Sequence, residues 1–347
     1  MVAISQRAQG LGTENAFVVL AEVNQLIRED RDIISFCIGQ PDFPTPTNIQ
    51  DAGVKAIREG KHGYTASAGI PELRQAAADY LNRTRTGIKA DPNDVVVAAG
   101  AKPFIGYSIL SVTDFGAGDE VIYPNPGFPI YESVINFLEA IPVPLPLKEE
   151  KEFRFDIADL EARITPKTRM VIINTPQNPT GGILTKEDLQ RIAELAVQHD
   201  FIVLSDEIYS QITYDGFVHE TITQFPGMKE RTILLDGFSK TFAMTGWRMG
   251  YGCMPEHIAQ VVAKLQTNCT SCTASYNQIA GIEALSERTD AKAAEFVAEF
   301  KRRRDVIVES LNAMPGVRCH SPKGAFYVYP NIEGTGMTSQ EFADFSL

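Results

Sequence analysis

Several features that would point to other classes of protein are scarce in this sequence. Among its 347 residues there is one tryptophan, and cysteine and histidine occur five times each. No run of about 18 apolar residues occurs, so a membrane-spanning helix is not expected. The first ten residues, MVAISQRAQG, lack the apolar core of a secretory signal peptide. These absences lead us to expect a cytoplasmic protein with no membrane partner.

An excess of positive charge is also missing. Lysine and arginine number 32 against 44 aspartate and glutamate residues, which gives a formal net charge of −12. A chain of this sign repels the phosphate backbone of nucleic acids, and no basic stripe with interleaved aromatic residues occurs. We therefore expect no nucleic-acid partner. The basic cluster KRRR, residues 301–304, is interpreted as the solvated face of a helix.

The cysteines do not form the pattern of a disulfide framework or a zinc site. Their number is odd, which is consistent with reduced thiols. Cys269 and Cys272 have the C-x2-C spacing, but no second pair and no suitably spaced histidine accompanies them. We predict no metal site and interpret the pair as one helical turn that carries two buried thiols.

Apolar runs and helical segments alternate through the middle of the chain. The runs cover residues 95–98, 120–123, 170–173, 201–204 and 232–235. Stretches with helical periodicity, such as 186–199, separate them, which predicts an α/β fold with a mostly parallel sheet and helices on both faces. The proline-rich span 141–147 is interpreted as an extended crossing segment, and residues 284–313 as a long amphipathic helix.

The segment DGFSKTFAMTGWRMG, residues 236–250, carries the strongest chemical signal. It sets the amine of Lys240 and the guanidinium of Arg248 eight positions apart among small and hydroxyl residues. A lysine beside Ser239 indicates an imine to a carbonyl cofactor, and an arginine two residues past a glycine indicates a forked phosphate donor. A nucleotide-binding phosphate loop is excluded, because that motif needs glycine directly before the lysine.

Two segments upstream supply the other groups that such a cofactor requires. Asn178 lies in a turn after the apolar run 170–173, and Asp206 and Tyr209 follow the next run. In open parallel sheets the carboxyl ends of the strands form the ligand crevice, so these residues should converge with Lys240. The set matches pyridoxal phosphate. A buried carboxylate keeps the pyridine nitrogen protonated, while an amide and a phenol donate to the ring oxygen and lower the pKa of the imine.

Four further motifs stand in a fixed order along the chain. They are CIGQPDFPTP (37–46), GYTASAGIPELR (63–74), AAGAKPF (98–104) and YPNPGFPIYESVI (123–135). With the segments above, they make the chain resemble the class I and II aminotransferases of the fold type I pyridoxal phosphate superfamily, such as the aspartate, alanine and aromatic aminotransferases. The resemblance runs almost from end to end. It implies a large domain with a mostly parallel sheet and a smaller α+β domain.

The resemblance also implies the catalytic residues. Lys240 resembles the lysine that forms the Schiff base and then moves the proton between the substrate α-carbon and the cofactor. Asp206 resembles the partner of the pyridine nitrogen, and Tyr209 resembles a donor to the ring oxygen. Asn178 resembles a second donor to that oxygen and also lies on the substrate side, where Gly39 resembles the glycine beside the substrate carboxylate.

The remaining implied contacts surround the ring face and the phosphate. Phe128 resembles the aromatic residue that stacks on the ring. The turn Gly100, Ala101 and Lys102 resembles the one whose backbone N–H groups hold the phosphate at a helix N-terminus, with Ser239 as a hydroxyl donor and Arg248 as the charged clamp. Tyr64 resembles the phenol that reaches the phosphate from a neighbouring subunit, which implies a homodimer.

The resemblance divides the chain into three parts. Residues 1–40 are expected to form an N-terminal arm with part of the small domain, residues 41–283 the large cofactor-binding domain, and residues 284–347 the rest of the small domain. Family members continue past GAFYVYP (324–330) to an arginine that binds the substrate α-carboxylate, and this chain stops at Leu347 before such a motif. We therefore expect the small domain to be incomplete, and we expect the chain to bind the cofactor but to handle substrate poorly.

These observations predict a pyridoxal phosphate dependent transaminase that moves an amino group between an L-amino acid and a 2-oxo acid. Two alternatives remain open at this point. The first is a β-lyase of sulfur amino acids, which needs the same lysine and ring. The second is a fragment that binds the cofactor with impaired turnover. Aspartate, alanine and aromatic amino acids all remain possible substrates.

Overall fold

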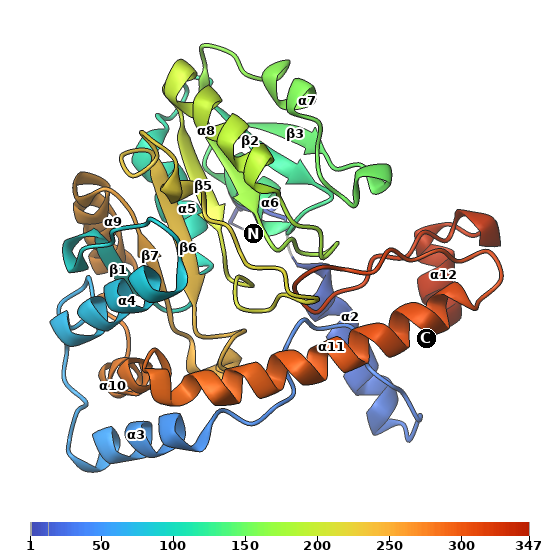
Figure 1. Ribbon diagram of the computed structural model, residues 1–347, viewed down its shortest axis with the longest axis horizontal. Helices are drawn as coiled ribbons and strands as arrows, with labels where there is room; N and C mark the ends of the chain where they lie inside the picture. Colours follow the sequence, from blue (N-terminus) through green and yellow to red (C-terminus); the bar gives the residue numbers. More distant parts are fainter. Residues whose placement is uncertain (1, 13, 347) are drawn as a thin grey trace.

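A seven-stranded sheet forms the centre of the molecule in the computed structural model, which describes residues 2–12 and 14–346 (Figure 1). Its strands are β1 (Val95–Ala98), β2 (Glu120–Asn125), β3 (Ile141–Pro146), β4 (Thr168–Asn174), β5 (Ile202–Asp206), β6 (Thr232–Gly237) and β7 (Gly250–Cys253). They lie in the order β1-β7-β6-β5-β4-β2-β3. Strands β3, β2, β4, β5 and β6 are parallel, while β7 is antiparallel to both β6 and β1. The predicted mostly parallel sheet is confirmed.

Each of the five apolar runs overlaps a strand, but two strands have a different sequence signal. The span 141–147, interpreted as a crossing segment, instead contains β3, which pairs with β2 at the edge of the sheet. That interpretation was wrong because Pro142 and Pro144 lack an N–H, and an edge strand tolerates this loss on its unpaired side. The second unexpected strand, β7, is short and contains two glycines, which weaken the pattern of a strand.

Helices cover both faces of the sheet (Figure 1). The helices are α1 (Gln6–Gln9), α2 (Asn15–Arg28), α3 (Thr47–Arg58), α4 (Pro71–Thr84), α5 (Pro103–Val112), α6 (Ile130–Phe137), α7 (Ile157–Glu161), α8 (Lys186–His199), α9 (Glu256–Thr270), α10 (Ser275–Ala284), α11 (Asp290–Asn312) and α12 (Ser339–Ser346). Val96 and Leu204 belong to a core with α5, α6 and α9. On the opposite face, Val97 packs with α4 and α10, and Val203 with α8. Because both faces are buried, the strands read as continuous apolar runs.

The helical predictions hold with one shift. α8 has the predicted bounds and begins with a capping box, in which Thr185 and Asp188 satisfy each other's backbone N–H groups. The predicted helix at 284–313 begins later, at Asp290, because α10 ends at Ala284 and a turn separates it from α11. In Figure 1, α11 is the long helix that runs from α10 toward the C-terminal segment. The division into parts 1–40, 41–283 and 284–347 stays a prediction, and its outermost positions, 1 and 347, lie outside the described residues.

The interpretation of residues 301–304 as a solvated face is wrong at Arg304. Its guanidinium is buried and donates to Asp215 Oδ2 at 2.6 Å and to Asp305 Oδ1 at 2.5 Å. It also lies 4.7 Å from the centroid of the Tyr214 ring. The loop that carries Tyr214 and Asp215 packs on this face of α11. This tertiary contact buries the Arg304 side chain, which the charge pattern of the sequence predicts to be exposed.

The predicted turn with two buried thiols is also wrong. α9 ends at Thr270, and Ser271 leaves the helix with a φ of +64°. Cys269 is exposed and Cys272 is half-buried. In the described part of the chain, no group of three or more His, Cys, Asp or Glu side chains is arranged to hold a metal ion. No helix within residues 2–12 and 14–346 is both long and apolar enough to cross a membrane.

Candidate active site

The predicted residues meet where the parallel strands end. Asp206 is the last residue of β5, Lys240 follows the end of β6 at Gly237, and Asn178 follows the end of β4 at Asn174. The Asn174 side-chain amide donates to the Asp206 carbonyl oxygen at 3.0 Å. The Asn178 backbone N–H donates to Asn174 Oδ1 at 2.8 Å. These hydrogen bonds hold the Asn178 and Asp206 segments together, and Lys240 is near enough for its charge to act on the pKa of Asp206. This is the arrangement expected at the carboxyl edge of an open parallel sheet.

Asp206 is a buried carboxylate whose hydrogen bonds come from neutral donors. The Tyr131 hydroxyl on α6 donates to Asp206 Oδ2 at 2.6 Å, and the Ile208 N–H donates to Oδ1 at 3.3 Å. Burial raises the pKa of Asp206 to about 6, although these two hydrogen bonds act to lower it. The negative charge at this position is therefore costly unless a cationic group joins it. Sequence reasoning missed Tyr131, which lies within the motif YPNPGFPIYESVI without a distinguishing pattern.

The amine of Lys240 is partly buried and points to the backbone of the segment at Gly39. Its Nζ donates to the Gly39 carbonyl oxygen at 2.5 Å. Burial lowers the pKa of Lys240 to about 8, and the charge of Arg248 acts in the same direction, whereas Glu14 raises it. A lysine with a lowered pKa is a better nucleophile near neutral pH, because a larger fraction of the amine is unprotonated.

Two tyrosines form the wall beside Lys240. The Lys240 Nζ lies 5.9 Å from the centroid of the Tyr209 ring. The Tyr209 hydroxyl is 2.6 Å from the hydroxyl of Tyr327, which comes from the C-terminal motif GAFYVYP. A methyl group at Gly39 would overlap the Tyr327 hydroxyl, so this close approach requires glycine. Sequence reasoning predicted Tyr209 and Gly39 but missed Tyr327.

A turn at Gly100 and the guanidinium of Arg248 form a cradle at the N-terminus of α5. Gly100 has a φ of +96°, and a Cβ there would overlap Arg248 Nη2. The backbone of Gly250 on β7 packs against Ala101, where a Cβ would also overlap. Arg248 donates to the Thr245 carbonyl oxygen at 3.0 Å and is exposed on its outer side. This arrangement leaves glycine backbone and a cation at a helix N-terminus, which suits an anionic group.

The other predicted contacts lie around this cluster. Ser239 is buried directly before Lys240. The Lys102 amine pairs with Glu14 Oε2 at 2.7 Å and lies 5.2 Å from the centroid of the half-buried Phe128 ring. The side chain of Lys102 thus pairs with Glu14 of the N-terminal segment, while its backbone directly precedes α5. Tyr64 is 92% exposed, so a single chain does not bring its phenol into the buried cluster.

Comparison with known proteins identifies the family. A family model described as aminotransferase class I and II matches residues 31–344. The chain belongs to this family. An aspartate aminotransferase of Pyrococcus horikoshii is 43% identical over 317 residues, which cover 91% of this chain and 80% of that protein. Aromatic-amino-acid aminotransferase 2 of Thermococcus litoralis is 41% identical, with coverage of 91% and 80%.

The fold of this aminotransferase agrees with solved structures. The structure of Thermus thermophilus aspartate aminotransferase with maleate matches with a TM-score of 0.91 at 34% identity, covering 95% of this chain and 85% of that chain. A structure of an aromatic aminotransferase from Pyrococcus horikoshii matches with a TM-score of 0.87 at 39% identity, covering 93% and 86%. The chain is thus a fold type I aminotransferase, and its family uses pyridoxal phosphate.

A buried ionic cluster lies directly behind the aminotransferase site. Arg85 Nε donates to Glu207 Oε2 at 2.8 Å, and Arg85 Nη2 donates to Asp236 Oδ2 at 2.6 Å. His219 Nε2 and the Thr221 hydroxyl also contact the Glu207 carboxylate, at 2.8 and 2.7 Å. All five side chains are buried. The cluster joins the ends of β5 and β6, the strands that lead to Asp206 and Lys240.

Sequence reasoning missed this cluster as a set. Its only local signal was the presence of two acidic residues, Glu207 and Asp236, at the ends of strongly apolar strands. Their common partner, Arg85, follows α4 and is more than 100 positions away in the chain. No periodicity or motif in the sequence joins positions so far apart.

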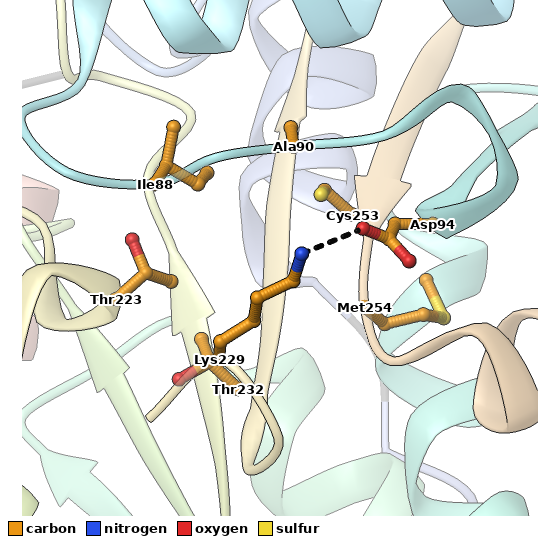
Figure 2. Close-up of a pocket in the computed structure, with 8 residues that line it drawn as sticks. All are labelled: Ile88, Ala90, Asp94, Thr223, Lys229, Thr232, Cys253 and Met254. Atoms are coloured by element: carbon orange, nitrogen blue, oxygen red, sulfur yellow. Dashed lines mark ion pairs between the residues drawn. The ribbon is translucent and has the colours of Figure 1, made fainter. Parts of the chain in front are cut away.

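A small pocket lies away from this site. It is lined by Ile88, Ala90, Asp94, Thr223, Lys229, Thr232, Cys253 and Met254 (Figure 2). The Lys229 amine points toward Asp94, with 3.7 Å between Nζ and Oδ2. Thr232 begins β6, whereas Lys240 follows the end of that strand. The pocket is therefore at the opposite end of the parallel strands and contains none of the predicted site residues.

Proposed function

We propose that this aminotransferase binds pyridoxal phosphate at the carboxyl edge of the sheet and transfers amino groups between an L-amino acid and a 2-oxo acid through Lys240. One observation carries the proposal: an amine with a lowered pKa, a buried carboxylate and the Gly100 cradle converge on one site. A Cβ would fill that cradle, so its residues fit a phosphate group. When bound, pyridoxal phosphate supplies an aldehyde that accepts the amino group and a ring that accepts an electron pair.

Lys240 and Asp206 carry the central roles in this proposal. With the cofactor bound, the Lys240 amine would be the group that holds its aldehyde, and the same amine, when free, would take the proton from the substrate α-carbon. Its lowered pKa supports both tasks at neutral pH. The Asp206 carboxylate is buried and accepts hydrogen bonds from uncharged groups, the Tyr131 hydroxyl and the Ile208 N–H. A protonated pyridine nitrogen would give it a cationic partner.

The rest of the site orients the cofactor and the substrate. The turn at Gly100, Ala101 and Lys102, the Ser239 hydroxyl and the Arg248 guanidinium would hold the phosphate. The Gly100 N–H itself donates to the Ala98 carbonyl oxygen at 2.8 Å, which holds the turn in shape. Asn178 and Tyr209 donate to the ring oxygen, and Phe128 covers the ring. Gly39, whose carbonyl oxygen accepts from Lys240, borders the substrate position together with Asn178.

The relatives support two classes of amino donor. The similar proteins of Pyrococcus horikoshii and Thermococcus litoralis are named an aspartate and an aromatic-amino-acid aminotransferase. We therefore propose aspartate or an aromatic amino acid as the donor, with a 2-oxo acid as the acceptor.

We also propose that the active unit is a homodimer. Tyr64 is 92% exposed, and the N-terminal segment exposes Phe17, Val18, Ile34 and Phe36, by 54%, 59%, 80% and 82%. Exposed apolar surface of this kind is typical of an interface, and two-fold dimers are the most common assemblies. Sedimentation velocity with activity measured across the boundary tests the assembly. We expect activity with the dimer, and an active monomer would contradict the proposal.

The experiment for the reaction is a half-reaction assay. The protein is loaded with pyridoxal phosphate, single amino donors are added without a 2-oxo acid, and the absorbance of the cofactor and the released product are measured. We expect conversion of the absorbance with one equivalent of 2-oxo acid per site for aspartate or an aromatic amino acid, and no conversion in Lys240→Ala. Continued product release without an acceptor would indicate a lyase. Unchanged absorbance with every donor would indicate a protein that binds without turnover.

A further inference from the structure

Two phenols of the site form a pair that the proposed roles do not explain. The hydroxyls of Tyr209 and Tyr327 are 2.6 Å apart although the residues are 118 positions apart in the chain. Within the described residues, each hydroxyl has the other as its side-chain hydrogen-bond partner. The pair holds two phenolic protons and uses one of them in the mutual hydrogen bond. One O–H therefore remains able to donate to a third group.

The surroundings indicate which phenol donates outward. Tyr209 follows Asp206 by three positions, and the Lys240 amine lies 5.9 Å from the centroid of its ring. The Tyr327 hydroxyl packs closely against Gly39, and a Cβ at that position would overlap it. The Gly39 carbonyl oxygen on this segment already accepts from Lys240 at 2.5 Å. Tyr209 is thus the phenol beside the Lys240 amine and near Asp206 in the chain, whereas the Tyr327 hydroxyl packs against the Gly39 segment.

We propose that Tyr327 donates its phenolic proton to the Tyr209 hydroxyl and thereby fixes Tyr209 as a donor toward the ring oxygen of the cofactor. This inference rests on the proposed function, in which Tyr209 has that role. A hydroxyl that accepts one hydrogen bond becomes a stronger donor in the next, because neighbouring hydrogen bonds polarise each other. Tyr327 is therefore a positioning residue that acts through Tyr209.

The fold holds Tyr327 rigidly enough for this task. The adjacent Phe326 stacks on Phe300 of α11 with 4.9 Å between ring centroids. Phe300 in turn contacts Phe43 at 5.0 Å, and Phe43 stacks on Phe296 at 4.4 Å. On the other side, the Ala325 N–H donates to the Ile212 carbonyl oxygen at 2.9 Å. The aromatic stack and the backbone hydrogen bond fix the backbone that carries the Tyr327 ring.

The main test measures the absorbance of the bound cofactor against pH in the absence of substrate. A stronger donor to the ring oxygen lowers the pH at which the absorbance changes, so Tyr327→Phe should raise this midpoint by roughly 0.5 pH unit. Tyr209→Phe should raise it further, by more than about 1 unit. Tyr107→Phe is the matched control. It removes a buried hydroxyl that bonds to Gln266 Oε1 at 3.1 Å, on segments that do not carry Tyr327, and it should leave the midpoint unchanged.

A second variant keeps the hydroxyl and the fold. Replacing Tyr327 with a ring-fluorinated tyrosine makes its phenol more acidic and a stronger donor, so the midpoint should move down, opposite to the effect of Tyr327→Phe. Thermal melting of the cofactor-free proteins shows that each variant is folded. A midpoint that stays in place for both changes at Tyr327 overturns the inference.

The remaining outcomes separate this inference from the proposed function. If Tyr209→Phe moves the midpoint and neither change at Tyr327 does, only the inference fails. If Tyr327→Phe has an effect as large as Tyr209→Phe, Tyr327 is itself the outward donor and the inference is wrong. If the wild-type protein shows no cofactor absorbance, or Tyr209→Phe leaves the midpoint unchanged, the proposed role of Tyr209 fails and the inference fails with it.

Discussion

Asp206 and Glu207 are neighbours at the end of β5, both fully or almost fully buried, yet they occupy opposite electrostatic environments. Asp206 receives a phenol and a backbone N–H, and burial raises its pKa to about 6. Burial also acts to raise the pKa of Glu207, but His219 and Arg85 overcome it and lower the pKa to about 2. Side chains on successive strand positions face opposite sides of the sheet, so one strand end serves two regions.

The difference separates a carboxylate kept for a ligand from one used within the fold. Glu207 has its cation inside the chain, in Arg85, which also binds Asp236 and so joins β5 to β6. Among the described residues Asp206 makes no ion pair. The nearby charge of Lys240 acts to lower its pKa, but burial outweighs it, so the negative charge stays costly until a cationic group binds. Substitution of Asp206 should therefore affect mainly the reaction rate, and substitution of Glu207 mainly the stability of the fold. The following changes test this difference.

The largest effect is expected on the rate at Asp206. Asp206→Ala should lower the half-reaction rate on the order of 100-fold to 1000-fold. Without the carboxylate, the pyridine nitrogen of the cofactor would lose its proton, and the positive charge that helps the ring accept electrons would be lost with it. The cofactor-free protein should keep its melting temperature, since the wild-type carboxylate is costly there. Single-turnover absorbance and thermal melting measure the two effects. A rate within a few-fold of wild type would mean that Asp206 is only part of the fold.

The next effect is expected on stability at Glu207. Glu207→Gln leaves the Arg85 guanidinium buried with less compensation, and breaking a buried pair in this way costs about 3 kcal/mol of unfolding free energy. Urea unfolding of the cofactor-free protein measures it. The matched control is Glu194→Gln on α8, whose carboxylate pairs with Arg191 at the surface and should change stability by less than about 1 kcal/mol. Equal effects at both positions would contradict the comparison.

The pH dependence of stability should differ in sign between the two carboxylates. Glu207 has a folded pKa of about 2 against an ordinary value of 4.5, so its contribution is present above pH 4.5 and is lost as pH falls toward 2. Asp206 has a folded pKa of about 6 against an ordinary 3.8, so the folded state takes up a proton first and gains stability as pH falls through 6.

The measurement is urea unfolding of the cofactor-free protein at several pH values. Between pH 7 and pH 4, wild type should gain on the order of 2 kcal/mol relative to Asp206→Asn. Relative to Glu207→Gln, wild type should instead lose stability below pH 4.5. A flat difference for Asp206→Asn would show that burial does not control this carboxylate.

The sequence was sufficient for the central strands and for the order of the main site residues. Lys240, Asp206 and Asn178 each follow an apolar run, and the rule that parallel strands end at one edge brings them together. The approach of Arg248 to Gly100 was implied only by the resemblance to the aminotransferases, and the structure brings the two together.

The remaining features depend on contacts between distant segments. Tyr131, Tyr327 and Arg85 act through partners far along the chain, and their own neighbourhoods in sequence carry no pattern for those contacts. The edge strand β3 was misread because prolines argue against strands except where one side is unpaired. Arg304 was misread because the loop at Asp215 covers it.

The most direct test of the account is to locate the covalent bond between protein and cofactor. The protein is loaded with pyridoxal phosphate, reduced with borohydride, digested and mapped by mass spectrometry. The convergence of Lys240 with Asp206 and the Gly100 cradle predicts the pyridoxyl label on Lys240, and its loss in Lys240→Ala. A label on Lys102, whose amine lies 5.2 Å from the centroid of the Phe128 ring, or on any other lysine would contradict the central claim.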